Sequence, residues 1–143
     1  MLTFISGQSD RQATIDLTLA YAQYGATKLE RTFFLNGSGS SSTVELRDVI
    51  QTKGSLPMEW TMNTRANISL SPDGLTATLQ SEDVIIRGRL SAPAGVVFST
   101  AKVNPAPPNE KINGVTRLMV NLTEEQSKDA VLSVVFSAAT VHV

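Results

Sequence analysis

Apolar and polar residues alternate along most of this chain, and this feature constrains the fold more than any other. Alternation with period two places apolar side chains on one face of a strand and polar side chains on the other. Helical patterns are scarce: we expect the polar run at 124–129 to be a turn rather than a packed helix, and a single helical turn around 20–23. The pattern therefore predicts an all-β protein.

Turn residues divide the alternating pattern into short segments. Clusters such as NGSGSSS, SPDG and SAPAG are rich in glycine, proline and serine, which end strands. Many short strands joined by polar turns indicate an antiparallel β-sandwich, and we predict roughly ten strands in a single domain spanning 1–143. The expected strands are approximately 2–6, 12–19, 27–35, 43–50, 57–63, 66–71, 75–80, 83–90, 95–102, 115–122 and 130–142.

Two connections have sequences that predict their roles. In SPDG, at 71–74, proline fixes φ and glycine permits a positive φ, so the flanking segments should form a hairpin. The stretch NPAPPNEKING, at 104–114, contains three prolines that cannot donate ladder hydrogen bonds. We expect it to cross between sheets, or to cap an edge, in an extended form.

Each of two expected neighbouring strands carries one charged residue in an otherwise apolar face. These faces are Leu29, Arg31, Phe33 and Leu35 in one strand, and Val44, Leu46, Asp48 and Ile50 in the other. If Leu35 lies opposite Val44, the antiparallel register places Arg31 opposite Asp48. Since an unpaired charge on a core face costs several kcal/mol, we interpret Arg31 and Asp48 as a structural ion pair rather than as catalytic or ligand-binding groups.

The composition excludes several kinds of site. The chain has no cysteine and a single histidine, His142, so a disulfide framework, a thiolate metal site and a zinc-binding histidine cluster are excluded. We predict no metal, no cofactor and no catalytic residue, because His142 is expected to face solvent at the end of the last strand. Carboxylates are available for acid–base chemistry, but no spacing distinguishes a pair.

Charge and hydropathy limit the partners. The formal net charge is -1, which gives no overall field to hold nucleic acid or an acidic membrane surface. The longest apolar runs, such as VLSVVF, are far shorter than the ~20 residues of a membrane span. We therefore predict no nucleic-acid partner and no membrane insertion.

A few residues are candidates for binding a substrate. Trp60 and Tyr24 could each stack on a sugar ring, although the methionines on both sides of Trp60 at strand spacing favour a core position for the indole. Arg87 and Arg89 share one strand face and form the best local basic patch, suited to carboxylate or sulfate. An ordinary exposed charged strand would also explain the two arginines.

Seven segments that together cover most of the chain form an ordered pattern: DLTLAY, KLERTFFL, VELRDVI, MEWTMNT, LSPDGLTATL, GVTRLMVNL and VLSVVF. The pattern is an aspartate-led strand ending in alanine-tyrosine, then an arginine-bearing strand and an aspartate-bearing strand. In this order the segments resemble the C-terminal β-sandwich region of heparinase II/III-like polysaccharide lyases.

This resemblance implies a context for the chain. Members of that family are multi-domain enzymes that cleave uronate-containing polysaccharides by β-elimination, with a catalytic tyrosine supplied by an upstream α/α toroid. The family's histidine-bearing segments precede the matched region, so the resemblance implies a chain that is inactive alone. It also implies an acidic polysaccharide as partner, a periplasmic or extracellular location, a structural role for Arg31 and Asp48, and a Tyr21 that plugs the sandwich end with its hydroxyl bonded to backbone.

Three functions remain open from the sequence. The first is an accessory β-sandwich domain that supports a catalytic toroid in a lyase of this kind. The second is a free-standing carbohydrate-binding module, which an exposed Trp60 would favour. The third is a structural or oligomerising sandwich, which an exposed apolar edge or sheet face would favour.

Overall fold

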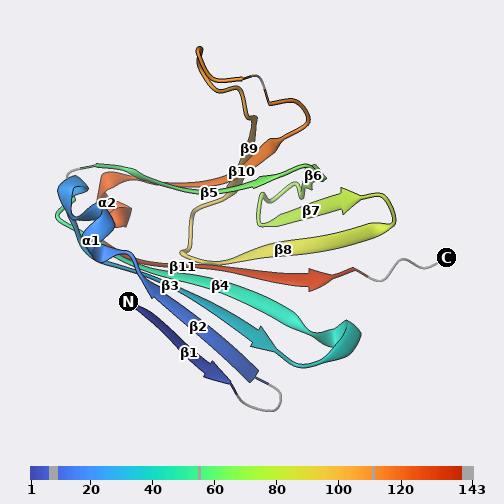
Figure 1. The fold of residues 1–143 in the computed structure, drawn as a ribbon, viewed down its shortest axis with the longest axis horizontal. Helices are drawn as coiled ribbons and strands as arrows, with labels where there is room; N and C mark the ends of the chain where they lie inside the picture. Colours follow the sequence, from blue (N-terminus) through green and yellow to red (C-terminus); the bar gives the residue numbers. More distant parts are fainter. Residues whose placement is uncertain (7–9, 55, 111, 140–143) are drawn as a thin grey trace.

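The computed structural model describes residues 1–6, 10–54, 56–110 and 112–139, and these fold into two facing antiparallel β-sheets (Figure 1). The predicted all-β, sandwich-like fold is confirmed. Within the described residues the strands are divided very unequally, eight in one sheet and three in the other. This inequality determines which parts of the molecule are left uncovered.

The large sheet is built from both ends of the chain, and its central strand β11 lies between β4 and β8. In spatial order its strands are β1 (Leu2–Ser6), β2 (Asp10–Asp16), β3 (Ala26–Asn36), β4 (Thr43–Thr52), β11 (Asp129–Ala138), β8 (Val84–Ala92), β7 (Thr76–Ser81) and β6 (Asn67–Leu70). The small sheet contains β5 (Met58–Thr64), β10 (Thr116–Leu122) and β9 (Phe98–Lys102), in that order. Short helical turns complete the described chain: α1 (Thr18–Tyr21), η1 (Ala22–Tyr24), η2 (Gly39–Ser41) and α2 (Glu124–Ser127).

Alternating apolar residues form the core between the two sheets. Leu118, Val120 and Leu122 of β10 are buried, as are Leu132 and Val134 of β11. In β10 they alternate with exposed or partly exposed neighbours, which is the period-two pattern of a strand with one core face, whereas in the more central β11 the intervening Ser133 is buried as well. The predicted SPDG hairpin is also present, with β6 paired to β7 and Asp73 Oδ1 accepting a hydrogen bond from the Leu75 N–H at 3.0 Å.

The small sheet covers only part of the large one. Its β9 and β10 contact β6 at one edge of the large sheet. At its other side, β5 lies over β3 and β4, with which it lines a shared cavity. Figure 1 shows β1 and β2 continuing beyond the small sheet, so no second layer from the described residues covers the inner face at this end of the large sheet.

Three local predictions were wrong. The strand expected at 12–19 ends at Asp16, because the chain turns there into α1 and η1. The run at 124–129 contains a one-turn helix with a capping box at Thr123 and a buried Ser127, where a polar turn was expected. For 104–114 the first of the two expected roles, a crossing between sheets, was wrong: the stretch joins the adjacent strands β9 and β10 of one sheet, and the Val103 N–H donates to Val115 O at 3.0 Å and prolongs their pairing.

Candidate functional site

The connection from β2 to β3 folds over one end of the sandwich and carries both tyrosines. At its start, Asp16 Oδ1 accepts a hydrogen bond from the Thr18 N–H at 2.9 Å, and Thr18 Oγ1 accepts from the Leu29 N–H at 3.0 Å. At its end, Gly25 has a φ of 90°, which favours glycine, and its carbonyl accepts from the Lys53 N–H at 3.0 Å. Both ends of the connection are therefore fastened to the large sheet.

Tyr21 and Tyr24 form a tilted aromatic pair at this end. Their ring centroids are 6.3 Å apart, the ring planes meet at 52°, and both side chains are exposed. The pair lines a hollow of about 420 Å³ whose other walls include Leu56, Pro57 and Met58. Exposed rings over an apolar hollow provide a surface on which a flat apolar group or a sugar ring can stack.

Arg31 and Asp48 lie between the sheets beside this hollow. Arg31 Nε and Nη2 donate to the two carboxylate oxygens of Asp48 at 2.7 and 2.6 Å, in the register predicted from sequence. The Asp48 side chain is 6% exposed and that of Arg31 is 29% exposed. The hydrogen bonds from Asp48 raise the pKa of Arg31 above its usual value, although its burial acts in the opposite direction.

A cavity of about 160 Å³ runs from this ion pair along one side of β5. Arg31, Asp48, Tyr21 and Trp60 contribute to its lining, which also includes Leu17, Leu29, Ile50, Met58, Glu59, Thr61 and Leu122. The Trp60 Nε1 atom is buried, and it has no hydrogen-bond acceptor among the described residues. Two features therefore meet at this cavity. One is a buried indole N–H that has no partner among the described residues, and the other is an arginine whose charge Asp48 already neutralises.

The outer side of β5 is a free sheet edge, because within the described residues β5 pairs with β10 alone. Val103 and Val115 directly extend β9 and β10, and they are hydrogen-bonded to each other. Because hydrogen-bonded pairs recur at every second residue of an antiparallel ladder, the odd-numbered residues of β10 bond to β9. The even-numbered residues of β10 therefore bond to β5, where their partners are Met58, Trp60, Met62 and Thr64. It follows that Glu59 and Thr61 direct their backbone N–H and C=O groups towards the free edge.

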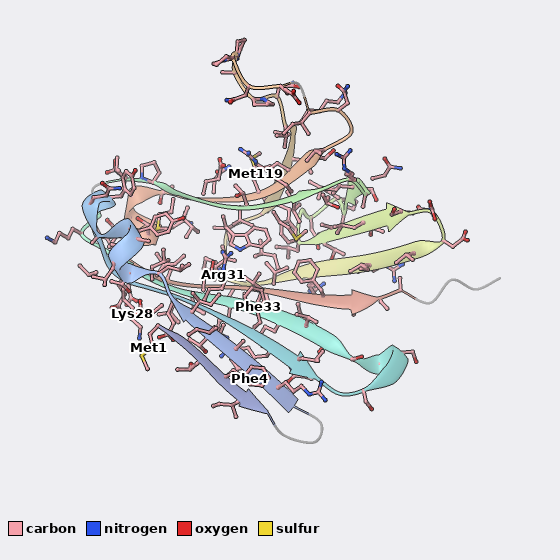
Figure 2. The ribbon with its side chains drawn as sticks, in the orientation of Figure 1. Met1, Phe4, Lys28, Arg31, Phe33 and Met119 are labelled. Atoms are coloured by element: carbon pink, nitrogen blue, oxygen red, sulfur yellow. The ribbon has the colours of Figure 1, made fainter. Side chains whose placement is uncertain are left out.

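Beyond this edge lies the uncovered inner face of the large sheet, which we call the open face and define as Leu2, Phe4, Phe33, Leu35 and Val44. All five side chains are exposed, Leu2 and Phe4 by 68% and 67%. The registers of β1 to β4 place them on one face of the sheet. Figure 2 shows Phe4 and Phe33 on this part of the sheet, with Arg31 between the two sheets.

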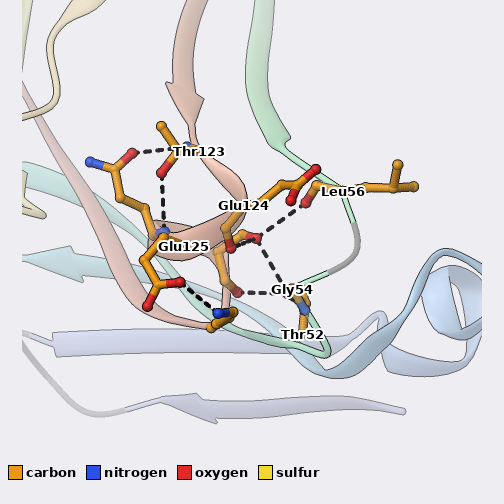
Figure 3. Close-up of polar contacts among 9 residues, drawn as sticks. Thr52, Gly54, Leu56, Thr123, Glu124 and Glu125 are labelled. Carbon is orange, nitrogen blue, oxygen red and sulfur yellow. Dashed lines mark hydrogen bonds and ion pairs between the residues drawn. The ribbon is translucent and has the colours of Figure 1, made fainter.

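Helix α2 holds the loop that forms one wall of the tyrosine hollow (Figure 3). The buried Ser127 Oγ lies 3.2 Å from Leu56 O and 2.9 Å from Glu124 O. Thr52 Oγ1 donates to Ser127 O at 3.0 Å and accepts from the Gly54 N–H at 3.0 Å. These bonds connect α2, the end of β4 and the segment that leads into β5.

The structure separates the residues proposed for substrate binding. Trp60 is 5% exposed and packs against Phe98 with ring centroids 6.5 Å apart, so the indole cannot stack on a ligand from solvent. Arg87 and Arg89 are exposed on the face of β8 opposite the buried Leu90, which is the outer face of the large sheet. Of the four proposed binding residues, only Tyr24 lines an exposed hollow, and Tyr21 lines the same hollow.

Two further expectations concern Tyr21 and His142. Tyr21 is exposed at the sandwich end, and none of the hydrogen bonds among the described residues involves its hydroxyl, so the expected bond to backbone is absent. His142 lies outside the described residues.

In the part of the chain that the structure describes, no three histidine, aspartate or glutamate side chains gather closely enough to hold a metal ion. No helix there is long and apolar enough to cross a membrane.

The fold and the site together define an antiparallel β-sandwich whose second layer is incomplete on one side. No family model and no curated protein matches this chain.

Proposed function

We propose that the protein is an accessory β-sandwich domain that supports a second domain docked over its open face. The observation that carries this proposal is the uncovered inner face at β1 to β4, which is mostly apolar and includes the exposed Arg11 opposite Leu35. Large exposed apolar patches mark interaction surfaces. The resemblance to heparinase II/III-like lyases supports a toroid as the docked domain and a saccharide-processing enzyme as the parent.

The energy available from the open face favours a linked domain over a free partner. Burying a leucine or phenylalanine completely contributes about 1.5–3 kcal/mol, so covering the five partly exposed side chains contributes on the order of 5 kcal/mol. Association of two free proteins costs about 4–15 kcal/mol in lost translational and rotational freedom. A covalently linked domain avoids most of that cost, because its effective concentration is high.

Site-specific photo-crosslinking in the native host tests this function. A photoreactive phenylalanine analogue replaces Leu35 on the open face, and the matched control carries it at Val131, an exposed residue of β11 on the outer face. The expected adduct is a polypeptide segment that contains an α/α toroid, formed from position 35 only. Equal adducts from both positions, or none from position 35, would reject a docking role for the open face.

The tyrosine hollow favours saccharide binding as a second function. The supporting observation is the exposed pair Tyr21 and Tyr24 above an apolar hollow of about 420 Å³. Asp48 already neutralises Arg31, and Glu59 adds a carboxylate to the lining, so this hollow favours a neutral sugar over the acidic polymer that the resemblance implies.

Calorimetric titration with neutral and uronate-containing oligosaccharides tests saccharide binding. Saturable binding of a neutral glucan that Tyr24→Ala weakens at least tenfold, and that Arg87→Ala on the outer face leaves unchanged, is the expected result. Binding that is confined to uronates and lost in Arg87→Ala would instead assign recognition to the outer face.

A further inference from the structure

We propose that the docked partner contributes a β-hairpin that pairs with the free edge of β5 and extends the small sheet across the open face. This inference rests on the proposed docking function and specifies how docking occurs. It assigns the free edge of β5 as the main attachment point, whereas the sequence had singled out Trp60 of this strand for stacking on a sugar. The partner is therefore recognised by its backbone and by an alternating apolar face.

The first argument is the chemistry of the edge. Glu59 and Thr61 present N–H and C=O groups to the free side of β5, where they line the cavity of about 160 Å³. Unpaired edge groups are a template for strand addition. No proline or bulge interrupts β5, since its sequence is MEWTMNT and its pairing with β10 is continuous, and Glu59 is the one charged residue in the strand.

The second argument is the fit of a hairpin to the uncovered strands. Neighbouring strands lie about 4.8 Å apart, so two added strands reach about 10 Å beyond β5. That distance spans the inner face of β3 and β2 and reaches β1, where the open face lies. The added layer continues the existing interface between the sheets, because Leu29 and Ile50 under β5 belong to the same inner face as Phe33 and Val44.

The third argument is that unpaired polar groups lie in the path of the hairpin. Asp48 binds Nε and Nη2 of Arg31, which leaves the Nη1 N–H groups for other acceptors. Trp60 lines the same cavity, and its buried Nε1 has no acceptor among the described residues. The backbone carbonyls of an added strand lie in the plane of the small sheet, so an acceptor for either donor has to come from an inward-facing side chain of the hairpin.

The fourth argument excludes antiparallel pairing with a second copy of this chain. The two-fold axis of an antiparallel strand pair lies along the sheet normal, so self-pairing through β5 keeps both large sheets on the same side. Each copy extends β3, β2 and β1 beyond its own β5, and the two large sheets would then occupy the same space. Pairing at β1 instead would lengthen the large sheet and leave the open face uncovered.

Synthetic β-hairpins are the probe for this proposal. Each peptide has about 14 residues and an Asn-Gly turn, with valine and leucine on one face and threonine and lysine on the other. Binding to the intact chain is followed by amide NMR shifts and by hydrogen exchange. The expected result is at least tenfold slower exchange of the Glu59 and Thr61 amides, with shifts at Phe33.

Thr61→Pro provides the decisive variant, with Thr61→Ala as its matched control. Proline removes an N–H that faces the free edge, a position at which strands tolerate it. Binding should be lost in Thr61→Pro and retained in Thr61→Ala. If the proline variant does not fold, the exchange pattern of the unmodified chain still decides the question.

Two results would overturn the proposal. One is hairpin protection that maps to β1 or β6 in place of β5, and the other is the absence of binding by every hairpin at millimolar concentration. Crosslinking from position 35 to a toroid, together with either result, would leave the docking function standing and reject strand addition alone. Loss of both the crosslink and the hairpin binding would reject the docking function as well.

Discussion

Removing Arg31 should destabilise the fold by leaving the buried Asp48 carboxylate without its partner. In Arg31→Met, the Asp48 carboxylate loses both of its charge-assisted hydrogen bonds while its side chain remains 6% exposed. Breaking a buried ion pair by removing one partner costs about 3–5 kcal/mol. For a domain of this size, that loss lowers Tm by roughly 3 °C per kcal/mol, or about 10 °C in total.

A double-mutant cycle separates the ion pair from simple packing. Asp48→Leu leaves a guanidinium that is 29% exposed and can turn towards water, so its expected cost is smaller, about 2 kcal/mol. Arg31→Met combined with Asp48→Leu replaces both charges with apolar groups and should lie within about 1 kcal/mol of the wild type. The double variant should therefore be more stable than Arg31→Met alone.

Urea unfolding followed by Trp60 fluorescence measures all three variants. The measurement is made at pH 7, where the guanidinium is charged, because Asp48 raises the pKa of Arg31 and the contribution of the arginine is therefore lost only as the pH rises far into the alkaline range. A cost below about 1 kcal/mol for Arg31→Met would refute the reasoning, as would single-variant costs that simply add in the double variant.

Three further predictions concern other parts of the fold. Ser127→Ala removes a buried hydroxyl beside Leu56 O and should cost about 1–3 kcal/mol in urea unfolding; an unchanged midpoint would exclude a role for this network. Gly88→Ala places a methyl group 2.8 Å from Phe136 Cε1 and should cost about 1–3 kcal/mol at an unchanged m-value. The hydroxyl of Ser71, which begins the SPDG turn, is the main group that lowers the carboxyl pKa of Asp73, so an NMR titration should give a midpoint below 3.8. The stability that this turn contributes should be lost as the pH falls through that midpoint.

Local pattern was sufficient to predict the strands and one register. Period-two alternation is a property of neighbouring residues, so it locates strands wherever one face is buried. The pairing of β3 with β4 was also predictable, because Arg31 and Asp48 are the charged residues on their apolar faces and only one register joins them. The SPDG hairpin followed from two residues with restricted or unusual φ angles.

The same pattern could not predict what covers each apolar face. Phe33 and Leu35 alternate in the same way as the buried Leu132 and Val134, yet they are exposed because the small sheet ends at β5. A sequence pattern reports that a face is apolar and contains no information about the layer above it. For the same reason the site at β5, the hollow between Tyr21 and Tyr24, and the separation of Trp60 from the outer arginines were not predictable.

The sequence by itself determined that this chain forms short antiparallel strands, and it determined which side chains share a face. These are consequences of backbone geometry over a few residues. Only the tertiary structure decided that, among the residues it describes, eight strands join one sheet and three join the other, and that β11 inserts between β4 and β8. Those choices depend on contacts between distant segments, and they leave one side of the sandwich without its second layer.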